Sequence, residues 1–410
     1  MKIGYPCIPL GVPYKTTRKF LLKNYNEELL YSCIDNNLDD LLNILKYNKS
    51  NNILMFRISS DIIPFGSHEI NILDWKKEFS SKLLEIGKYA KDNNIRLSMH
   101  PGQYTVINSP DLNILKRSIA DLKYHCDFLD SLGIDKKNKI ILHVGGVYGD
   151  KNSAIERFIQ TYKSLDKNIL DRLIIENDEK NYSLEDLLNI SHRCNVPIVF
   201  DNLHHFCYEG SIDIKNALKS AFSTWNYDDG PPKVHYSEQD KNKRLGSHSQ
   251  SIDINNVKEY IDASDGLDFD VMIEVKDKDF SAFKFNNFIQ FKDKDIPFEI
   301  ANKEFNRYKY YLFQRSLDHF NTGRDLLFNE GFYKFYSFLD KSIYDDISTE
   351  LSLKAFKDFK ENFSHLKTTE ENYLNKLFLS KDLKKIRDYF LKLSLRYKIP
   401  NILENYFLFF

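Results

Sequence analysis

Histidine and acidic side chains recur at the ends of short apolar segments of this chain. Five histidines occupy such positions: His100, His143, His204, His235 and His248. Three acidic residues end apolar segments in the same way: Glu176, Asp201 and Glu274. A single histidine at such a place is more often a hydrogen-bonded core residue than a ligand. Eight such groups that converge on one place indicate a shared chemical site instead.

The types of these side chains favour divalent metal ions as their partners. Burying carboxylates without partners is costly, and imidazoles alone do not neutralise three of them at neutral pH. Mixed imidazole and carboxylate ligands suit zinc, manganese or iron, whereas ligands that are all oxygen would indicate calcium or magnesium. Eight ligands suffice for two or three ions if one carboxylate bridges. Clustered ions of this kind cleave phosphodiester bonds, because one activates water while another stabilises the leaving oxygen.

The elements that must position these side chains are short strands that alternate with helices. Strand-like segments cover residues 3–7, 53–60, 96–100, 139–145, 172–177, 196–202, 233–237 and 270–275. Helical spacing of apolar residues covers 27–47, 74–93, 111–132, 152–168, 184–194, 212–222 and 254–263. Continuous Val, Ile, Leu and Phe segments are typical of parallel strands that are buried on both faces. The pattern predicts an α/β fold of the TIM (β/α)8 barrel type, whose active site lies where the strands end.

An open doubly wound sheet is the alternative architecture. That fold usually carries a glycine-rich turn, G-x-G-x-x-G, after its first strand, and this chain has no such turn. The barrel is therefore preferred.

The last third of the chain differs in composition, because it is rich in Phe and Tyr. Amphipathic helical patterns cover residues 305–320, 332–338, 353–363 and 383–397. We predict a barrel domain over residues 1–284 and an additional C-terminal α-helical domain over residues 285–410. We expect this domain to stabilise the protein by packing on the barrel, and we favour this role over that of an extra surface for DNA or a partner.

Composition limits the protein classes. The net charge of -1 gives no overall basic signature, so any DNA-binding surface must be local or completed by metal ions. No segment approaches the roughly 20 apolar residues that a membrane span requires, and the N-terminus has no signal-like apolar segment. The five cysteines never form a C-x-x-C pair, which favours reduced thiols. We expect a cytoplasmic protein without a membrane segment.

Several motifs together resemble the UV damage endonuclease family. They are GYPC, FRISSDIIPF, LSMHPGQY, LHVGG, ENDE, FDNLHH, KVHYSEQD and VMIEVKDKD, in this order over residues 1 to about 280. A more distant resemblance is to endonuclease IV and the xylose isomerase-like barrels. The family resemblance implies a metal-dependent, ATP-independent DNA repair endonuclease. It would nick damaged double-stranded DNA 5′ to cyclobutane pyrimidine dimers, 6-4 photoproducts and, in some members, abasic sites, leaving a 3′-hydroxyl and a 5′-phosphate.

The resemblance also implies a cofactor and a distribution of ligands. Manganese is the expected metal, with zinc as the alternative. No nucleotide cofactor is expected, and the protein is expected to be a monomer. His100, His143 and Glu176 would hold one ion; Glu176, Asp201, His235 and Glu274 a second; His204 and His248 a third. Glu176, Lys233 and Glu274 would take part in catalysis. Lys233, two residues before His235, should face the same side of its strand; it either neutralises carboxylates or, as the family implies, becomes carboxylated.

Four residues are expected to contact DNA by the same resemblance. Gln103 and Tyr104 resemble a wedge that fills the gap left by flipped-out bases, and Tyr5 and His68 match other family positions. Unstacking is easiest at distorted steps, so such an enzyme would recognise deformability rather than base identity. Some relatives carry an asparagine after the opening GY motif where this chain has Ile8 and Pro9.

Two other functions are compatible with such a barrel. A sugar isomerase or epimerase uses similar ligands, but the pair His204 and His248 has no role in hydride or proton transfer. A non-catalytic module that binds damaged DNA would gain nothing from eight charged or ligating groups in one pocket. Both alternatives are therefore less favoured than the nuclease.

Overall fold

The computed structural model describes residues 1–209, 213–292, 295–363 and 366–410. These residues form two compact units. The first unit comprises Met1–Pro9, Tyr14–Ile252 and Glu259–Lys278, and the second comprises Leu10–Pro13, Asp253–Lys258 and Asp279–Phe410. The second unit includes all described residues of the predicted C-terminal domain.

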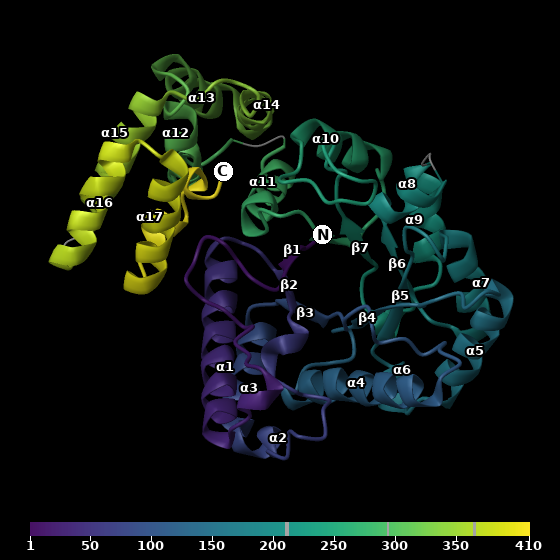
Figure 1. Cartoon of the computed structure of the whole chain (residues 1–410). Coiled ribbons are helices and arrows are strands. Elements are labelled where there is room, and N and C mark those ends of the chain that lie inside the picture. Colours follow the sequence, from purple (N-terminus) through teal and green to yellow (C-terminus); the bar gives the residue numbers. More distant parts are fainter. Residues whose placement is uncertain (210–212, 293–294, 364–365) are drawn as a thin grey trace. The chain divides into compact units, whose positions relative to one another are not determined.

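Eight parallel strands of the first unit close into a barrel in sequence order (Figure 1). The strands are β1 (Ile3–Pro6), β2 (Met55–Ile58), β3 (Arg96–Met99), β4 (Ile140–His143), β5 (Leu173–Glu176), β6 (Ile198–Asp201), β7 (Lys233–Tyr236) and β8 (Asp270–Ile273). Closure occurs between β1 and β8, where Ile3 lies opposite Val271. The structure confirms the predicted TIM barrel and excludes the open sheet.

Helices lie outside this ring of strands (Figure 1). They are α1 (Glu27–Ser50), α2 (Trp75–Glu78), α3 (Ser80–Asp92), α4 (Leu112–Ser131), α5 (Lys151–Ser164), α6 (Lys167–Leu170), α7 (Leu184–Cys194), α8 (Asn202–Glu209), α9 (Ile214–Phe222) and α10 (Ile254–Ala263), with 3-10 turns η1 (Leu22–Asn24), η2 (Ser60–Ile62) and η3 (Tyr227–Asp229). Two predictions need correction. The single helix expected over 74–93 is two helices that meet at Phe79, and α8, which begins directly after β6, was not predicted.

The strand period of two explains how the barrel interior is layered. Residues two apart on a strand face the same side, so Ile141 lies below His143, and Ile174 below Glu176. Ile141, Ile174 and Val199 form a buried apolar cluster against Trp225. This apolar layer supports the polar groups at the C-terminal ends of the strands.

From residue 279 on, all the regular elements that the structure describes in the second unit are helices. Its elements are α11 (Asp279–Gln290), α12 (Phe298–Phe313), α13 (Leu317–Glu330), α14 (Phe332–Ser342), α15 (Thr349–Lys360), α16 (Thr368–Ser380), α17 (Leu383–Tyr397), α18 (Pro400–Leu403) and the 3-10 turn η4 (Tyr406–Leu408). The helix predicted over 305–320 is wrong, because α12 ends at Phe313 and Ser316 caps α13 by accepting from the His319 N–H. No described helix has both the length and the hydropathy of a membrane span.

Candidate metal centre

The strand register brings the predicted ligands to one edge of the barrel. His143, Glu176 and Asp201 are the last residues of β4, β5 and β6. His143 lies opposite Glu176, and Asp201 lies opposite His235 of β7. His100 directly follows β3 and Glu274 directly follows β8. We call this edge, with these six residues and His204 and His248, the barrel mouth.

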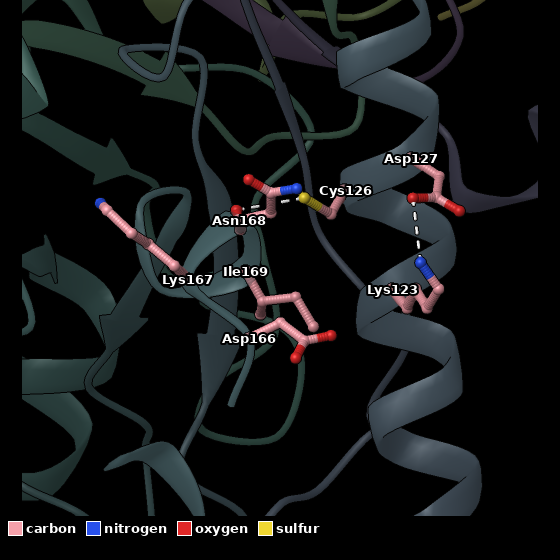
Figure 2. Close-up of a pocket in the computed structure, with 7 residues that line it drawn as sticks. All are labelled: Lys123, Cys126, Asp127, Asp166, Lys167, Asn168 and Ile169. Atoms are coloured by element: carbon pink, nitrogen blue, oxygen red, sulfur yellow. Dashed lines mark hydrogen bonds and ion pairs between the residues drawn. The ribbon is translucent and has the colours of Figure 1, made fainter. Parts of the chain in front are cut away.

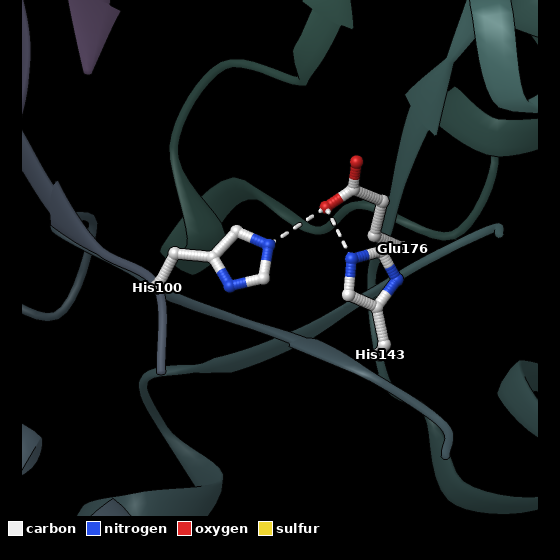
Figure 3. Close-up of side chains that lie close together, drawn as sticks. All are labelled: His100, His143 and Glu176. Carbon is white, nitrogen blue, oxygen red and sulfur yellow. Dashed lines mark hydrogen bonds and ion pairs between the residues drawn. The ribbon is translucent and has the colours of Figure 1, made fainter. Parts of the chain in front are cut away.

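The Glu176 carboxylate lies at the centre of the barrel mouth and is 1% exposed. Its Oε2 atom lies 3.1 Å from Nε2 of His100 and 3.7 Å from Nε2 of His143 (Figure 3). Its Oε1 atom lies 2.8 Å from Nδ1 of His235 and 3.7 Å from Nδ1 of His204. Four imidazoles therefore surround one buried carboxylate.

Two groups of side chains at the mouth are compact enough to hold a metal ion. They are His100, His143 and Glu176, and Glu176, Asp201 and His235; within each group the ligand atoms lie within 4.8 Å of one another. Glu274 extends the second group, since its Oε1 lies 3.2 Å from Nδ1 of His235. Because both groups contain Glu176, this carboxylate would contribute to both sites if each held an ion.

Buried atoms without partners mark the same place. Nδ1 of His143, Oδ2 of Asp201 and Nε2 of His235 are buried and have no hydrogen-bond partner within the described ranges. Buried polar atoms are nearly always paired in folded proteins. These atoms are electron-pair donors of the kinds that divalent transition metals accept, so the donor set fits the predicted cofactor.

The remaining two predicted ligands lie beside these groups. The rings of His204 and His248 have centroids 6.5 Å apart, and those of His143 and His204 are 5.8 Å apart. His204, on α8, donates its backbone N–H to Oδ1 of Asp201 at 2.8 Å, and its Nδ1 donates to the Asn177 carbonyl at 3.0 Å. His204 is thus firmly positioned, whereas His248 is on the loop after β7.

Burial and mutual charge set the protonation of the mouth. Burial lowers the pKa of His100 to about 4, so its ring is neutral and can ligate. Burial raises the pKa of Glu176, but the charges of His235 and His143 and hydrogen bonds to His100 and His235 outweigh it, and the pKa falls well below its usual value. Burial lowers the pKa of His204, but Asp201 and Glu176 raise it to about 9. A metal ion would displace that proton.

Asp201 differs from the other carboxylates at the mouth. Its side chain is 0% exposed, and burial, opposed by His204 but reinforced by Glu176 and Glu274, raises its pKa. A buried carboxylate with a raised pKa is stabilised when it binds a proton, or a metal ion in place of that proton. This behaviour is consistent with a ligand position.

Lys233 lies inside the barrel, two residues before His235 on β7. It is 1% exposed, and its Nζ has no hydrogen-bond partner among the described residues. Burial, together with the charges of Arg96 and Arg57, lowers the pKa of this amine well below its usual value. Burial therefore favours the neutral amine form of this side chain.

Arg57 on β2 was not among the predicted site residues. Its guanidinium forms an ion pair with Glu274, and both side chains are largely buried. The sequence signal was a cation inside the apolar strand of the FRISSDIIPF motif, next to a predicted strand end. Arg57 fixes the Glu274 carboxylate; burial raises the pKa of Glu274, but Arg57 and His235 hold it below its usual value.

The residues predicted to contact DNA occupy different environments. Gln103 and Tyr104 are exposed on the loop after β3, and the Tyr104 side chain is 84% exposed. His68 is also exposed, and its Nδ1 accepts from the Ile70 N–H at 3.1 Å. Tyr5 is fully buried on β1 and donates from its hydroxyl to Oδ1 of Asn48 at 2.6 Å. The loop pair is therefore accessible, whereas Tyr5 belongs to the core.

A cavity of about 250 Å³ between α4 and α6 contains the thiol of Cys126 (Figure 2). The Cys126 Sγ donates to the Asn168 carbonyl at 3.1 Å. Burial, followed by the charge of Asp130, raises the pKa of this thiol to about 11. The thiol stays protonated at neutral pH, so this cavity offers no nucleophile to compete with the barrel mouth.

Comparisons with known proteins agree with the geometry. The sequence profile of the family described as UV-endonuclease UvdE matches residues 14–301. A UV DNA damage endonuclease of Clostridium perfringens (strain 13 / Type A) is 46% identical over 412 residues, covering 98% of this chain and 97% of that protein. A UV DNA damage endonuclease of Bacillus cereus (strain G9842) is 35% identical and covers 69% of this chain and 93% of its own length. The crystal structure of SacUVDE, at 39% identity and a TM-score of 0.67, covers 71% of this chain and 98% of its own. The chain belongs to the UV-endonuclease UvdE family.

Proposed function

We propose that this protein is a metal-dependent, ATP-independent DNA repair endonuclease that nicks the strand 5′ to UV lesions. Its substrates would be cyclobutane pyrimidine dimers, 6-4 photoproducts and abasic sites in double-stranded DNA, and its products a 3′-hydroxyl and a 5′-phosphate. The observation that carries the proposal is the pair of compact ligand groups that share the buried Glu176. The names of the relatives, which describe UV DNA damage endonucleases, support the substrate.

Two or three divalent ions, manganese first and zinc as the alternative, would occupy the barrel mouth. His100, His143 and Glu176 would hold one ion, while Glu176, Asp201, His235 and Glu274 would hold a second. His204 and His248 would hold a third. When bound, such ions supply Lewis acidity to activate a water and positive charge to stabilise the leaving oxygen.

The protein's own groups would prepare this chemistry. Glu176 orients the imidazoles around its two oxygens, and Arg57 holds Glu274 toward His235. Lys233 would be carboxylated, since burial favours the neutral form of its amine and that form can attack carbon dioxide. The new N–C bond forms as one C–O π bond of carbon dioxide opens onto its oxygen, and the nitrogen loses one proton to water, which gives a carbamate anion inside the barrel. The amine of Lys233 has no hydrogen-bond partner among the described residues. Its carbamate would offer oxygen atoms at the same place as additional metal ligands.

DNA recognition would use the exposed loop after β3. Gln103 and Tyr104 would enter the duplex at the lesion, since an exposed aromatic ring can stack on bases that have lost their neighbours. His68 would contact the DNA from its exposed loop. Tyr5 would have to leave its hydrogen bond with Asn48 in order to reach the lesion.

Nicking of a supercoiled plasmid tests the proposed function. The purified chain, supplied with Mn²⁺, should convert UV-irradiated plasmid to open circles while unirradiated plasmid stays supercoiled. A sugar epimerase or a damage-binding module would leave both plasmids intact, so the absence of nicks on irradiated DNA would contradict the proposal.

We also propose a barrel domain over residues 1–284 and a separable helical domain over 285–410, in a monomer that works in the cytoplasm without a nucleotide cofactor. The Bacillus cereus relative and SacUVDE align over nearly all of their own length but only about two thirds of this chain, which supports a separable extension. A chain that ends at Lys284 should still bind Mn²⁺ in calorimetry. A soluble truncated chain that binds no metal would contradict the boundary.

A further inference from the structure

A cleft of about 350 Å³ lies beside the candidate metal centre, in the first unit. Its lining residues are Pro6, Arg57, His248, Glu274, Val275, Lys276 and Lys278. Two of them, His248 and Glu274, belong to the barrel mouth, and three others carry a positive charge. We call this feature the cation cleft, since its positive charges outnumber the Glu274 carboxylate.

The three cations of the cleft differ in their partners. Arg57 is paired with Glu274, and Lys276 is paired with Asp240 at 3.1 Å. Lys278 is partly buried, yet within the described parts of the chain its ammonium has neither a hydrogen bond nor an ion pair. An ammonium group withdrawn from water without an anionic partner is costly. Lys278 is therefore the lysine of this cleft whose Nζ atom is not engaged in an ion pair within the described residues.

The backbone at Lys278 has a conformation that is uncommon for a residue with a side chain. Lys278 has a φ of 53°, in the left-handed region that favours glycine. Cys7 has a φ of 69° and follows β1, the strand that pairs with β8. Unfavourable backbone conformations of this kind are concentrated at functional sites. A lysine at such a position provides a charge that glycine would not.

We propose that the cation cleft binds a backbone phosphate of the DNA strand, with Lys278 as its principal contact. A phosphodiester is the anion that a DNA substrate presents at every nucleotide, and a lysine ammonium binds it as a point charge. Arg57 and Lys276 add positive charge around this phosphate. Because Glu274 lines the same cleft, a phosphate held there places the neighbouring phosphodiester at the metal centre. The inference rests on the proposed function, since it assigns a contact to the same substrate.

The salt dependence of DNA binding tests this contact. The probe is a fluorescent duplex with one cyclobutane pyrimidine dimer, and its Kd is measured by anisotropy at several NaCl concentrations with EDTA present, which prevents incision. The proteins are the full-length chain, Lys278→Ala, Lys278→Arg and a matched control, Lys88→Ala. Lys88 is an exposed lysine on α3 that pairs only with Asp92 among the described residues. Melting temperatures confirm that each variant is folded.

The expected results separate a phosphate contact from a structural role. Lys278→Ala should weaken binding roughly tenfold and lower the slope of log Kd against log salt by about 1, since one phosphate contact is lost. Lys278→Arg should restore most of that slope, and Lys88→Ala should match the unsubstituted chain. A folded Lys278→Ala variant with an unchanged slope would overturn the inference even if the unsubstituted chain nicks irradiated plasmid. If the unsubstituted chain fails to nick, the proposed function itself fails.

Discussion

Both ends of the barrel bury charged side chains, but the two ends differ in how fully these side chains are paired. At the N-terminal ends of the strands, a group that we call the barrel floor consists of three ion pairs: Arg96 with Asp270 at 2.9 Å, Lys139 with Asp229 at 2.5 Å, and Arg172 with Asp130 at 2.6 Å. Lys233, the first residue of β7, does not belong to this group, because its Nζ has no hydrogen-bond partner among the described residues. At the barrel mouth, atoms of His143, Asp201 and His235 have no partner in the described structure. Ile141 and Ile174 of the apolar layer lie on β4 and β5, which run from Lys139 and Arg172 at the floor to His143 and Glu176 at the mouth.

The contrast separates structural charge from functional charge. The Arg172 guanidinium makes hydrogen bonds to Asp130 and to the carbonyls of Ile134, Asp135 and Asn138, so its hydrogen-bonding capacity is used within the fold. A buried network of this kind maintains the structure but has nothing left to bind a ligand. The mouth retains unused donor atoms, and those atoms are what a metal ion requires. Perturbed pKa values occur at both ends, so the mouth is distinguished by several unpaired ligand atoms that lie close together.

The largest expected effect is at the mouth, in Glu176→Gln. The substitution removes the carboxylate shared by both ligand groups, so incision of UV-irradiated plasmid should fall roughly 100-fold or more. Circular dichroism should show a folded protein, because the floor is intact. Glu156→Gln, a carboxamide substitution in an exposed ion pair with Arg193, is the control. Full nicking activity of Glu176→Gln would contradict a functional role for the charged groups at the mouth.

At the floor, Arg172→Met should affect stability instead of chemistry. The substitution leaves several carbonyls and part of the Asp130 charge without a partner, and urea unfolding should show a loss of about 3 kcal/mol. Arg193→Met, which breaks only the exposed pair with Glu156, should cost less than about 1 kcal/mol. Nicking per folded molecule should be unchanged in both. Loss of Mn²⁺ binding by folded Arg172→Met would show that the two ends are coupled.

Metal removal should affect the mouth alone. The protein in EDTA should remain folded, and Mn²⁺ at 100 times its Kd should stabilise it by about 2.7 kcal/mol, because the ion binds only the folded chain. Thermal unfolding with and without Mn²⁺ measures this difference, and Glu176→Gln should show little of it. A chain that unfolds when EDTA is added would mean that the metal is structural.

The smallest effect is expected from the exposed loop at the mouth. Gln103→Ala combined with Tyr104→Ala should spare metal binding but reduce the preference for damaged over intact duplex about tenfold, since base stacking contributes roughly 1 to 3 kcal/mol. The control is Tyr227→Ala, because Tyr227 is 88% exposed on η3, which precedes β7 at the floor end. Competition binding with irradiated and intact duplexes gives the preference. Equal losses in both variants would contradict a specific wedge.

Strand positions were predictable because their residues are apolar on both faces and end in polar motifs. Each observed strand lies inside its predicted segment, and the convergence of Glu176, Asp201 and His235 followed from parallel strand ends. Helix breaks were less predictable, since the capping at Ser316 depends on a hydrogen bond that helical spacing does not reveal. The roles of Arg57 and Lys278 were also missed. Arg57 of β2 pairs with Glu274 after β8 across the intervening β1, and Lys278 has no ion-pair partner among the described residues. Both are properties of the folded chain, which the order of residues does not display.

The direct junction of β6 and α8 affects how the third ligand pair would assemble. Asp201 ends the strand and Asn202 begins the helix, so no loop separates Asp201 from His204. The hydrogen bond from the His204 N–H to Asp201 fixes their separation before any ion arrives. Binding of an ion at His204 would therefore cost the protein little conformational entropy, because this side chain is already ordered. His248 is held differently, by a backbone bridge with Gln239 in the segment after β7.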